Sequence, residues 1–397
     1  MNAQNNSPVQ DWLLNIGPIS CHAWNKDRTQ LAVSPSNNEI HIFARSDSSW
    51  KPLHVLTEHD LLITGLDWAP STNRLVSCSQ DKNAFVWTWE AEKNIWKPEM
   101  VLVRANRAAT CVKWSPNENK FAVGTGARMV AICYYDREND WWVAKQIKKP
   151  MRSTVTSLDW HPNNILLAVG ACDFKARVFS AYVKEIDEKP APNPWGTKMP
   201  LGELLKEYQS TGWVHDLAFS PSGGKLVWVS HDSSISVIDK SNSLQQERPI
   251  EFKTAFLPFT SVRWVNETNI VAAGHDCSPI LFTFDGVALK LKCKLDVPPE
   301  SKNGSHVSSA FEMFRSIDKK AVSVDSPLSS TALKTLHQNS IMQIRPHTGC
   351  SNQTGTVSKF STCSLDGVVA LWDVQEVFEY CQKRLGRPLL NGATSAL

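Results

Sequence analysis

The sequence lacks an apolar run of the length that crosses a bilayer. No stretch of its 397 residues approaches the roughly 18 apolar residues of a membrane-spanning helix. The first residues, MNAQNNSPVQD, hold no apolar segment of the secretory type, so we predict no signal peptide. An excess of one charge is also missing, because 42 Lys and Arg residues are balanced by 39 Asp and Glu residues. This balance argues against wholesale binding of nucleic acid. We therefore expect neither membrane insertion nor a nucleic-acid partner.

The signatures of catalysis and metal binding are missing as well. The ten cysteines include no C-x-x-C pair and no Cys/His cluster at zinc spacing, which is typical of reduced, mostly buried thiols in a cytosolic protein. There is no nucleophile elbow and no phosphate-binding loop. The pairs His231-Asp232 and His275-Asp276 could be mistaken for acid–base machinery, but both fall at a repeated turn position described below. We predict a protein that is not an enzyme and that uses no cofactor and no metal.

Tryptophan, in contrast, is abundant, with 16 residues, and one stretch shows why. Residues 63–87 contain three short runs with the alternation of half-buried strands, separated by turn residues. His59, Asp81 and Trp87, together with Ser77 or Ser79, resemble the buried hydrogen-bonded set of a WD repeat. A turn carboxylate that accepts hydrogen bonds from a histidine and from backbone N–H groups would tie two loops of a blade together.

This unit recurs along the chain. In most copies an aromatic residue that ends a first strand lies 19 positions before the residue that closes the third strand. The pairs are Trp24 and Phe43, Trp68 and Trp87, Trp114 and Cys133, Trp160 and Phe179, Phe219 and Ile238, with Trp264 and Phe282 one position closer. Six positions before the closing residue lies an aspartate in five copies: Asp81, Asp173, Asp232, Asp276 and Asp366. A period near 45 with several short strands is the mark of a β-propeller.

Seven copies fit, so we predict an all-β, seven-bladed WD-repeat β-propeller that occupies residues 1–397 as one domain. The last copy begins at residues 341–344, and His337, Asp366 and Trp372 restore the full polar set. The chain has no convincing outer strand after Trp372, so we predict that residues 12–16 supply it and close the ring, which removes exposed strand edges. The tail, residues 375–397, begins with a helical-looking segment.

Two of the intervals between successive copies of the repeat are longer than the others. Residues 184–208 read as a loop around the outer strand of blade four. For the second insertion, residues 298–339 between blades six and seven, we predict a short amphipathic helix over 308–320. Its apolar residues are Ala310, Phe311, Met313, Phe314 and Ile317. The helix either packs on the propeller rim or offers this face to a groove on a partner, and both interpretations stay open.

Basic residues gather before and within blade four. Residues 101–117 and 141–158 contain no acidic residue. The segment before a first strand and the turn that carries the aspartate lie on the same rim of a blade, which predicts one positive patch on blades three and four. Its residues are Arg107, Lys148, Lys149, Arg152 and Lys175. The patch is either a solvated charged rim or, on a protein that is nearly neutral, a surface for an acidic peptide or protein.

Several stretches resemble the WD-repeat subunit of the actin-related protein 2/3 complex over nearly the whole chain. They include ISCHAWNKDRTQLAVSP, NRAATCVKWSPNENKFAVGTGAR, ENDWWVAKQIKKPMRSTVTSLDWHPNN, VAAGHDCSPILF and FEMFRSIDKKA. The resemblance implies a non-catalytic subunit of the assembly that nucleates branched actin filaments, in the cytoplasmic actin cytoskeleton: cortical actin, lamellipodia or actin patches. It implies as partners the other subunits, the actin filament and the acidic tails of nucleation-promoting factors. The basic patch would then receive the acidic tail, and the insertion helix would face actin or the activator.

Two other classes of protein remain as alternatives. A free-standing WD-repeat adaptor that recognises acidic peptides or protein surfaces would be a stable monomer without small helical partners. An enzyme built on a propeller would show a polar cluster with perturbed pKa values at the mouth of the channel, and the sequence offers no candidate for one.

Overall fold

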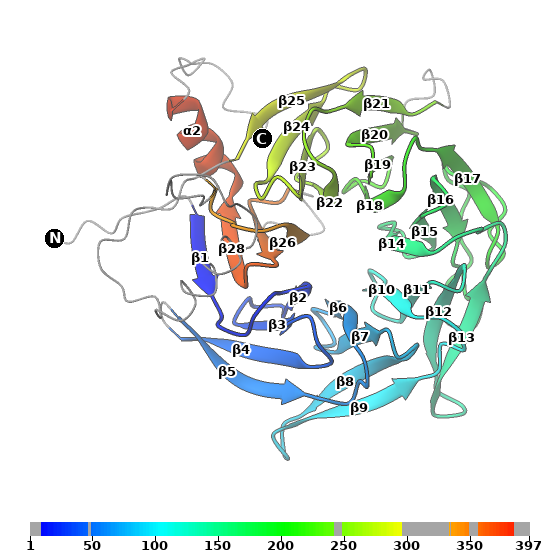
Figure 1. Cartoon of the computed structure of the whole chain (residues 1–397). Helices are drawn as coiled ribbons and strands as arrows, with labels where there is room; N and C mark the ends of the chain where they lie inside the picture. Colours follow the sequence, from blue (N-terminus) through cyan, green and yellow to red (C-terminus); the bar gives the residue numbers. More distant parts are fainter. Residues whose placement is uncertain are drawn as a thin grey trace, which may run out of the picture.

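The structure is a computed structural model that describes residues 9–46, 49–241, 248–295, 333, 335–348 and 356–384. Its strands form seven four-stranded antiparallel sheets arranged around a central axis (Figure 1). In six sheets the paired strands are consecutive in the chain, from the strand nearest the axis to the strand at the periphery, and in the seventh the N-terminal strand is the outer one. The prediction of a seven-bladed β-propeller is therefore confirmed.

The first three blades have the following strands. Blade one is β2 (Cys21–Trp24), β3 (Gln30–Ser34), β4 (Ile40–Ser46) and β5 (Ser49–Leu56). Blade two is β6 (Ile63–Trp68), β7 (Leu75–Ser79), β8 (Ala84–Glu90) and β9 (Ile95–Val101). Blade three is β10 (Ala109–Trp114), β11 (Lys120–Thr125), β12 (Met129–Asp136) and β13 (Trp141–Ile147).

The remaining blades continue around the ring. Blade four is β14 (Val155–Trp160), β15 (Leu166–Ala171), β16 (Lys175–Ser180) and β17 (Leu204–Gln209). Blade five is β18 (Val214–Phe219), β19 (Lys225–Ser230), β20 (Ser234–Asp239) and β21 (Ile250–Lys253). Blade six is β22 (Phe259–Trp264), β23 (Asn269–Gly274), β24 (Ile280–Phe284) and β25 (Leu289–Lys294). Blade seven is β26 (Ile341–Thr348), β27 (Lys359–Ser364), β28 (Val368–Asp373) and β1 (Val9–Leu13), and α2 (Val374–Arg384) follows β28.

The N-terminal strand closes the ring. β1 pairs antiparallel with β28, from Val9 opposite Trp372 to Leu13 opposite Val368 (Figure 1). The predicted closure is confirmed, although the predicted range of residues 12–16 starts too late. The strand ends at Leu13 because Asn15 adopts a left-handed conformation, with φ of 57°, that an extended strand cannot continue through. The predicted helix after β28 is also confirmed, as α2.

The spacing of 19 residues reflects a row of side chains across each blade. Trp68 lies opposite Leu75, and Leu75 lies opposite Trp87, so the two tryptophans belong to one row. In blade seven the residue of this row is Pro346, opposite Phe360, which lies opposite Trp372. The first strand of blade seven therefore extends past the predicted residues 341–344. The aromatic signal was missing there because a proline takes the position.

The hydrophobic core lies between adjacent blades. One cluster, for example, joins Val76 and Val86 of blade two to Trp114 and Val123 of blade three. These side chains are at most 5% exposed, and the removal of so much apolar surface from water is the main force that holds neighbouring blades together. The loop over residues 184–208 adds to this core, because its Trp195 is 1% exposed and donates a hydrogen bond from Nε1 to the Gly223 carbonyl at 2.8 Å.

Aspartates near the axis link one blade to the next. Asp67 of blade two accepts the backbone N–H of Trp114 in blade three at 2.8 Å. It also accepts a hydrogen bond from Arg345 of blade seven at 2.6 Å, which bridges past blade one. These inner bonds hold the blades in fixed relative positions, so a site on the rim rests on a rigid base.

The predicted insertion helix cannot be placed. Residues 308–320, with Phe311, Met313, Phe314 and Ile317, lie outside the described residues. The two sides of the insertion are described up to Leu295 and again at residue 333 and from residue 335. In the described part, no helix has the length and apolarity needed to cross a membrane.

Candidate functional site: a basic rim on blades three and four

The predicted polar set of blade two is present and fully connected. His59 Nδ1 lies 2.7 Å from Asp81 Oδ2, and His59 Nε2 lies 2.8 Å from Ser77 Oγ. Trp87 Nε1 donates to the same Ser77 oxygen at 2.9 Å. Burial lowers the pKa of His59 below its ordinary value, although Asp81 acts in the opposite direction. Of the two serines left open by the sequence, Ser77 belongs to the set, and Ser79 binds the Leu61 carbonyl instead.

Blade seven repeats this set with a threonine. His337 Nε2 lies 2.7 Å from Thr362 Oγ1, which also accepts a hydrogen bond from Trp372 Nε1 at 2.8 Å. His337 Nδ1 lies 3.3 Å from Asp366 Oδ2. Burial alone would raise the pKa of Asp366, but its hydrogen bond and charge interaction with His337 lower it overall. Both histidines have a structural part in these blades, as the repeat predicted.

The other turn aspartates also tie the turn to the loop before the blade. Asp173 accepts the Arg152 backbone N–H at 3.0 Å, and Asp276 accepts the Leu257 backbone N–H at 2.7 Å. Asp232 accepts a hydrogen bond from the Thr211 hydroxyl at 2.5 Å. In each of these blades, therefore, the preceding loop and the turn between the second and third strands lie on the same rim.

Blades three and four lack the histidine, hydroxyl and tryptophan of the polar set, and blade three also lacks the aspartate. Strand register aligns Ser77 with Val123 in blade three and with Val169 in blade four. The position of Trp87 holds Cys133 and Phe179, and that of His59 holds Ala105 and Met151. Replacing both partners of a buried hydrogen bond by apolar groups can be nearly neutral in stability, whereas replacing one is not. The turns of these two blades are thus held without a histidine.

The structure brings the predicted basic residues to one rim. Arg107 lies in the loop before blade three, and Lys148, Lys149 and Arg152 lie in the loop before blade four. Gly126 N donates to the Ala108 carbonyl at 2.9 Å, and Cys172 N donates to the Thr154 carbonyl at 2.9 Å, so each loop is bonded to the turn of its blade. Lys175 starts the strand that follows the second of these turns.

Two further arginines belong to this surface. Arg128 lies in the turn of blade three, and Arg104 lies in the loop before that blade. Gln146 Nε2, at the end of β13, donates to the Arg104 carbonyl at 3.1 Å, which holds this loop beside the segment leading to blade four. We call the combined surface the basic rim. It consists of Arg104, Arg107, Arg128, Lys148, Lys149, Arg152 and Lys175.

Most of the basic rim has no counter-charge. Apart from Lys175, each of its side chains is exposed and forms no ion pair or hydrogen bond with the described residues. Lys175 is half-buried and lies 3.2 Å from Glu207. The acidic residue within these turns and loops is Asp173, and Arg177 holds both its oxygens at 2.9 Å. The rim therefore presents uncompensated positive charge.

Other basic residues near these blades do not belong to the rim. Arg177 is 2% exposed and also bonds Glu207, so it is part of the blade and not of the surface. Lys113 pairs with Asp159 near the axis, and Lys145 pairs with Glu185 at 2.8 Å at the periphery. Strand register decides which basic residues lie at the edge of a blade, and it places these three away from the rim.

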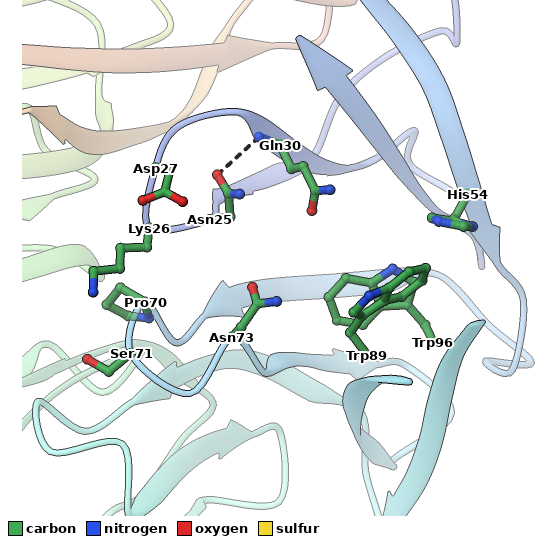
Figure 2. Close-up of a pocket in the computed structure, with 10 residues that line it drawn as sticks. All are labelled: Asn25, Lys26, Asp27, Gln30, His54, Pro70, Ser71, Asn73, Trp89 and Trp96. Carbon is green, nitrogen blue, oxygen red and sulfur yellow. Dashed lines mark hydrogen bonds between the residues drawn. The ribbon is translucent and has the colours of Figure 1, made fainter. Parts of the chain in front are cut away.

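Two cavities of the described residues lie away from the basic rim. One, of about 360 Å³, lies between blades one and two (Figure 2). Figure 2 shows Lys26 and Asp27 at one end and His54, Trp89 and Trp96 at the other. Lys26 and Asp27, which carry opposite charges, lie in a turn at the opposite end of the strands from the basic rim, and His54, Trp89 and Trp96 lie on strands. This cavity does not extend the positive surface.

The described residues show no reactive centre. Burial raises the pKa of Cys78 well above its ordinary value and that of Cys111 to about 12, so these thiols stay protonated and unreactive. His215 and His231 lie 2.9 Å apart, and burial, followed by the neighbouring His231 and His275, lowers the pKa of His215 to about 4. Within the described ranges, no group of three His, Cys, Asp or Glu side chains could hold a metal ion.

Comparisons with known proteins decide the family. Residues 50–88 match the model for the WD domain, G-beta repeat, and residues 112–193 match the model for the anaphase-promoting complex subunit 4 WD40 domain. The chain is 53% identical over 371 residues to actin-related protein 2/3 complex subunit 1A-A of Xenopus laevis, which covers 92% of this chain and 97% of that protein. The chain belongs to the family of actin-related protein 2/3 complex subunit 1.

More distant members of the subunit 1 family match over the same span. Subunit 1 of Schizosaccharomyces pombe (strain 972 / ATCC 24843) is 41% identical over 373 residues, or 88% of this chain and 95% of that protein. Subunit 1B of Arabidopsis thaliana is 37% identical over 375 residues, or 93% of this chain and 96% of that protein. The family resemblance drawn from the sequence is confirmed.

Proposed function

We propose that this chain is the propeller subunit of an actin-related protein 2/3 complex and that its basic rim binds acidic tails of nucleation-promoting factors. As a subunit 1 protein it is a non-catalytic part of the branched-actin nucleator, and it would work in the cytoplasmic actin cytoskeleton. The observation that carries the proposed rim function is the set of exposed cations on blades three and four without a counter-charge.

Charge and rigidity both support an acidic partner. A positive surface on a nearly neutral protein steers acidic segments toward one place and raises their rate of association. The loops that bear Arg107 and Arg152 are hydrogen-bonded to turns of the ring, so the charges are held in position before binding. Binding therefore costs little conformational entropy in the rim itself.

The insertion between blades six and seven is the second proposed contact. It leaves the ring at Leu295, whose N–H donates to the Pro279 carbonyl at 2.8 Å, and it returns near Gln338, whose N–H donates to Asp366 at 2.7 Å. Both anchors lie on the rim that carries the turn aspartates, which is also the face of the basic rim. We propose that Phe311, Met313, Phe314 and Ile317 meet actin or an activator on this face.

Membership in the complex is tested by affinity recovery of the tagged, endogenously expressed chain, with stoichiometry read by mass. We expect one copy each of two actin-related proteins and of small helical subunits. Recovery as a monomer, or with an unrelated set of proteins, would contradict the proposal and favour a free-standing adaptor.

The rim is tested by charge reversal in the assembled complex. Lys149→Glu with Arg152→Glu should weaken binding of a fluorescent acidic peptide at least about tenfold at low salt, because the exposed charges act through Coulomb interactions that salt screens. The matched control, Lys93→Glu with Lys290→Glu, makes the same charge change at two exposed lysines outside the rim, one in the turn between β8 and β9 and one in the outer strand β25. Unchanged affinity in the rim variant, or an equal loss in the control, would refute the assignment.

The insertion is tested by branching activity. Phe311→Ala with Phe314→Ala should reduce branch formation while the complex still assembles, because the substitution removes apolar contact area without adding charge. Full branching activity in this variant would remove the proposed contact.

A further inference from the structure

One turn position has the same unusual backbone in six of the seven blades. The residue that follows the turn aspartate, or Ala127 in blade three, adopts a left-handed conformation. These residues are Lys82 (φ 76°), Arg128 (φ 58°), Phe174 (φ 63°), Ser233 (φ 65°), Cys277 (φ 58°) and Gly367 (φ 82°). Glycine adopts this conformation freely, whereas a residue with a Cβ atom is strained in it. Blade seven therefore has the unstrained residue, and five blades do not.

The side chains at this position differ around the ring. In blades five and six they are small. At Ser233 the backbone carbonyl accepts hydrogen bonds from Thr254, and Cys277 is 6% exposed, with its thiol 3.5 Å from the His275 carbonyl. In blades two to four they are long and project to the surface: Lys82 and Arg128 are exposed, and Phe174 is 38% exposed.

Packing within the ring does not account for Arg128 and Phe174. Arg128 has no side-chain partner among the described residues. The Phe174 ring leaves more than a third of its surface in water, although a phenylalanine with positive φ is a rare and strained arrangement. Strained residues of this kind cluster at binding sites, where the surrounding structure holds them in place.

Both residues lie within the basic rim. Arg128 is two residues after Gly126, whose N–H is bonded to the loop that bears Arg107. Phe174 lies between Asp173, which Arg177 neutralises, and Lys175. An exposed ring among cations suits a partner that carries an apolar side chain within an acidic segment.

We propose that Arg128 and Phe174 are specificity-determining contacts of the basic rim. Arg128 binds a carboxylate of the acidic segment, and Phe174 packs against an apolar or aromatic side chain within it. This inference rests on the proposed binding of acidic tails to the rim. It implies that the chain gives up stability at two turns for the sake of binding.

The test separates stability from binding by glycine substitution in the assembled complex. Phe174→Gly and Arg128→Gly relieve the strain, so each should raise the melting temperature by about 1–2 °C. Each variant should also reduce the affinity for an acidic peptide with one aromatic residue about fivefold. Against the same peptide with alanine in place of the aromatic residue, Phe174→Gly should have no effect. Ser233→Gly is the control and should raise the melting temperature without changing either affinity.

The outcomes distinguish this inference from the proposed function. If Lys149→Glu with Arg152→Glu weakens binding but both glycine variants bind like the wild type, the inference is wrong and the rim function stands. If none of these variants changes affinity, both are wrong. A fall in melting temperature for Phe174→Gly would show that the ring stabilises the fold, and it would overturn the inference. Phe174→Asn, which tolerates the left-handed backbone, should reproduce the loss of binding.

Discussion

Blades two and seven differ from blades three and four in how they hold the same turn. In blades two and seven a buried histidine, a hydroxyl, a tryptophan and an aspartate form one hydrogen-bonded set. In blade three all four positions are apolar, with Val123 and Cys133 in the middle of the sheet. In blade four the aspartate remains and Arg177 binds it. The difference shows that the polar set is one solution to packing a blade, not a requirement of the fold.

The surface of blades three and four also differs from that of blades two and seven. In blades three and four, where the histidine is absent, the loops and turns carry exposed arginines and lysines. Blades one, five and six also lack the tryptophan, with Phe43, Ile238 and Phe282 at its position, so absence of the set does not by itself produce the basic rim. The comparison predicts that stability and binding can be altered separately.

The largest expected effect is on the polar set itself. Ser77→Val copies blade three into blade two at a single position and leaves both His59 Nε2 and Trp87 Nε1 buried without a partner. Each unsatisfied buried group is unfavourable, so we expect a loss of about 3 kcal/mol in the free energy of unfolding. Chemical denaturation measures it, and a loss below about 0.5 kcal/mol would mean that the set does not stabilise the blade.

The reciprocal substitution in blade three should cause a smaller loss of stability. Val123→Ser places one hydroxyl in the apolar row of blade three, where Ala105 and Cys133 offer no tryptophan or histidine to bind it. Burial of one polar group predicts a loss of about 1–2 kcal/mol, measured in the same way. A stabilised variant would contradict the view that blade three changed as a unit.

Acid should affect the histidine-bearing blades first. Burial lowers the pKa of His59, and burial, then Arg28, Arg45 and Lys359, lowers the pKa of His347 to about 4. With lowered pKa values, these histidines take up protons at lower pH in the folded protein than in the unfolded chain, where they bind protons below about pH 6.5, so stability falls as the pH drops below that value. We expect the free energy of unfolding to fall by about 1–2 kcal/mol between pH 7 and pH 5. Blade three contains no histidine, so hydrogen exchange should show its amides to be less affected than those of blade two.

The smallest effect on stability should come from the basic rim. Lys149 and Arg152 are exposed, so Lys149→Glu with Arg152→Glu should change the free energy of unfolding by less than about 0.5 kcal/mol. The same variant should lose most of its affinity for an acidic peptide. Loss of both stability and binding would mean that the rim is part of the scaffold.

The repeat was predictable from the sequence because in six copies the ends of one side-chain row lie 18 or 19 residues apart, and most of these residues are large. Trp68 and Trp87, or Trp264 and Phe282, are visible without a structure. The limits of the first strand of blade seven were harder to predict, because Pro346 replaces the aromatic residue. The basic rim was predictable in outline, since Arg107 and Lys149 fall in loops on one face. The exact residues of the basic rim were not predictable. The burial of Arg177 depends on strand register, and the left-handed turn at Phe174 depends on backbone angles, neither of which composition reveals.

Binding of an acidic segment to the basic rim is tested most directly by crosslinking. A photo-crosslinkable acidic peptide with one aromatic residue should be added to the assembled complex, and its crosslinks on this chain should be mapped by mass. We predict crosslinks within residues 102–108, 126–128, 148–154 and 172–175. Crosslinks confined to the turns of blades two and seven, near Asp81 and Asp366, would contradict binding at the basic rim.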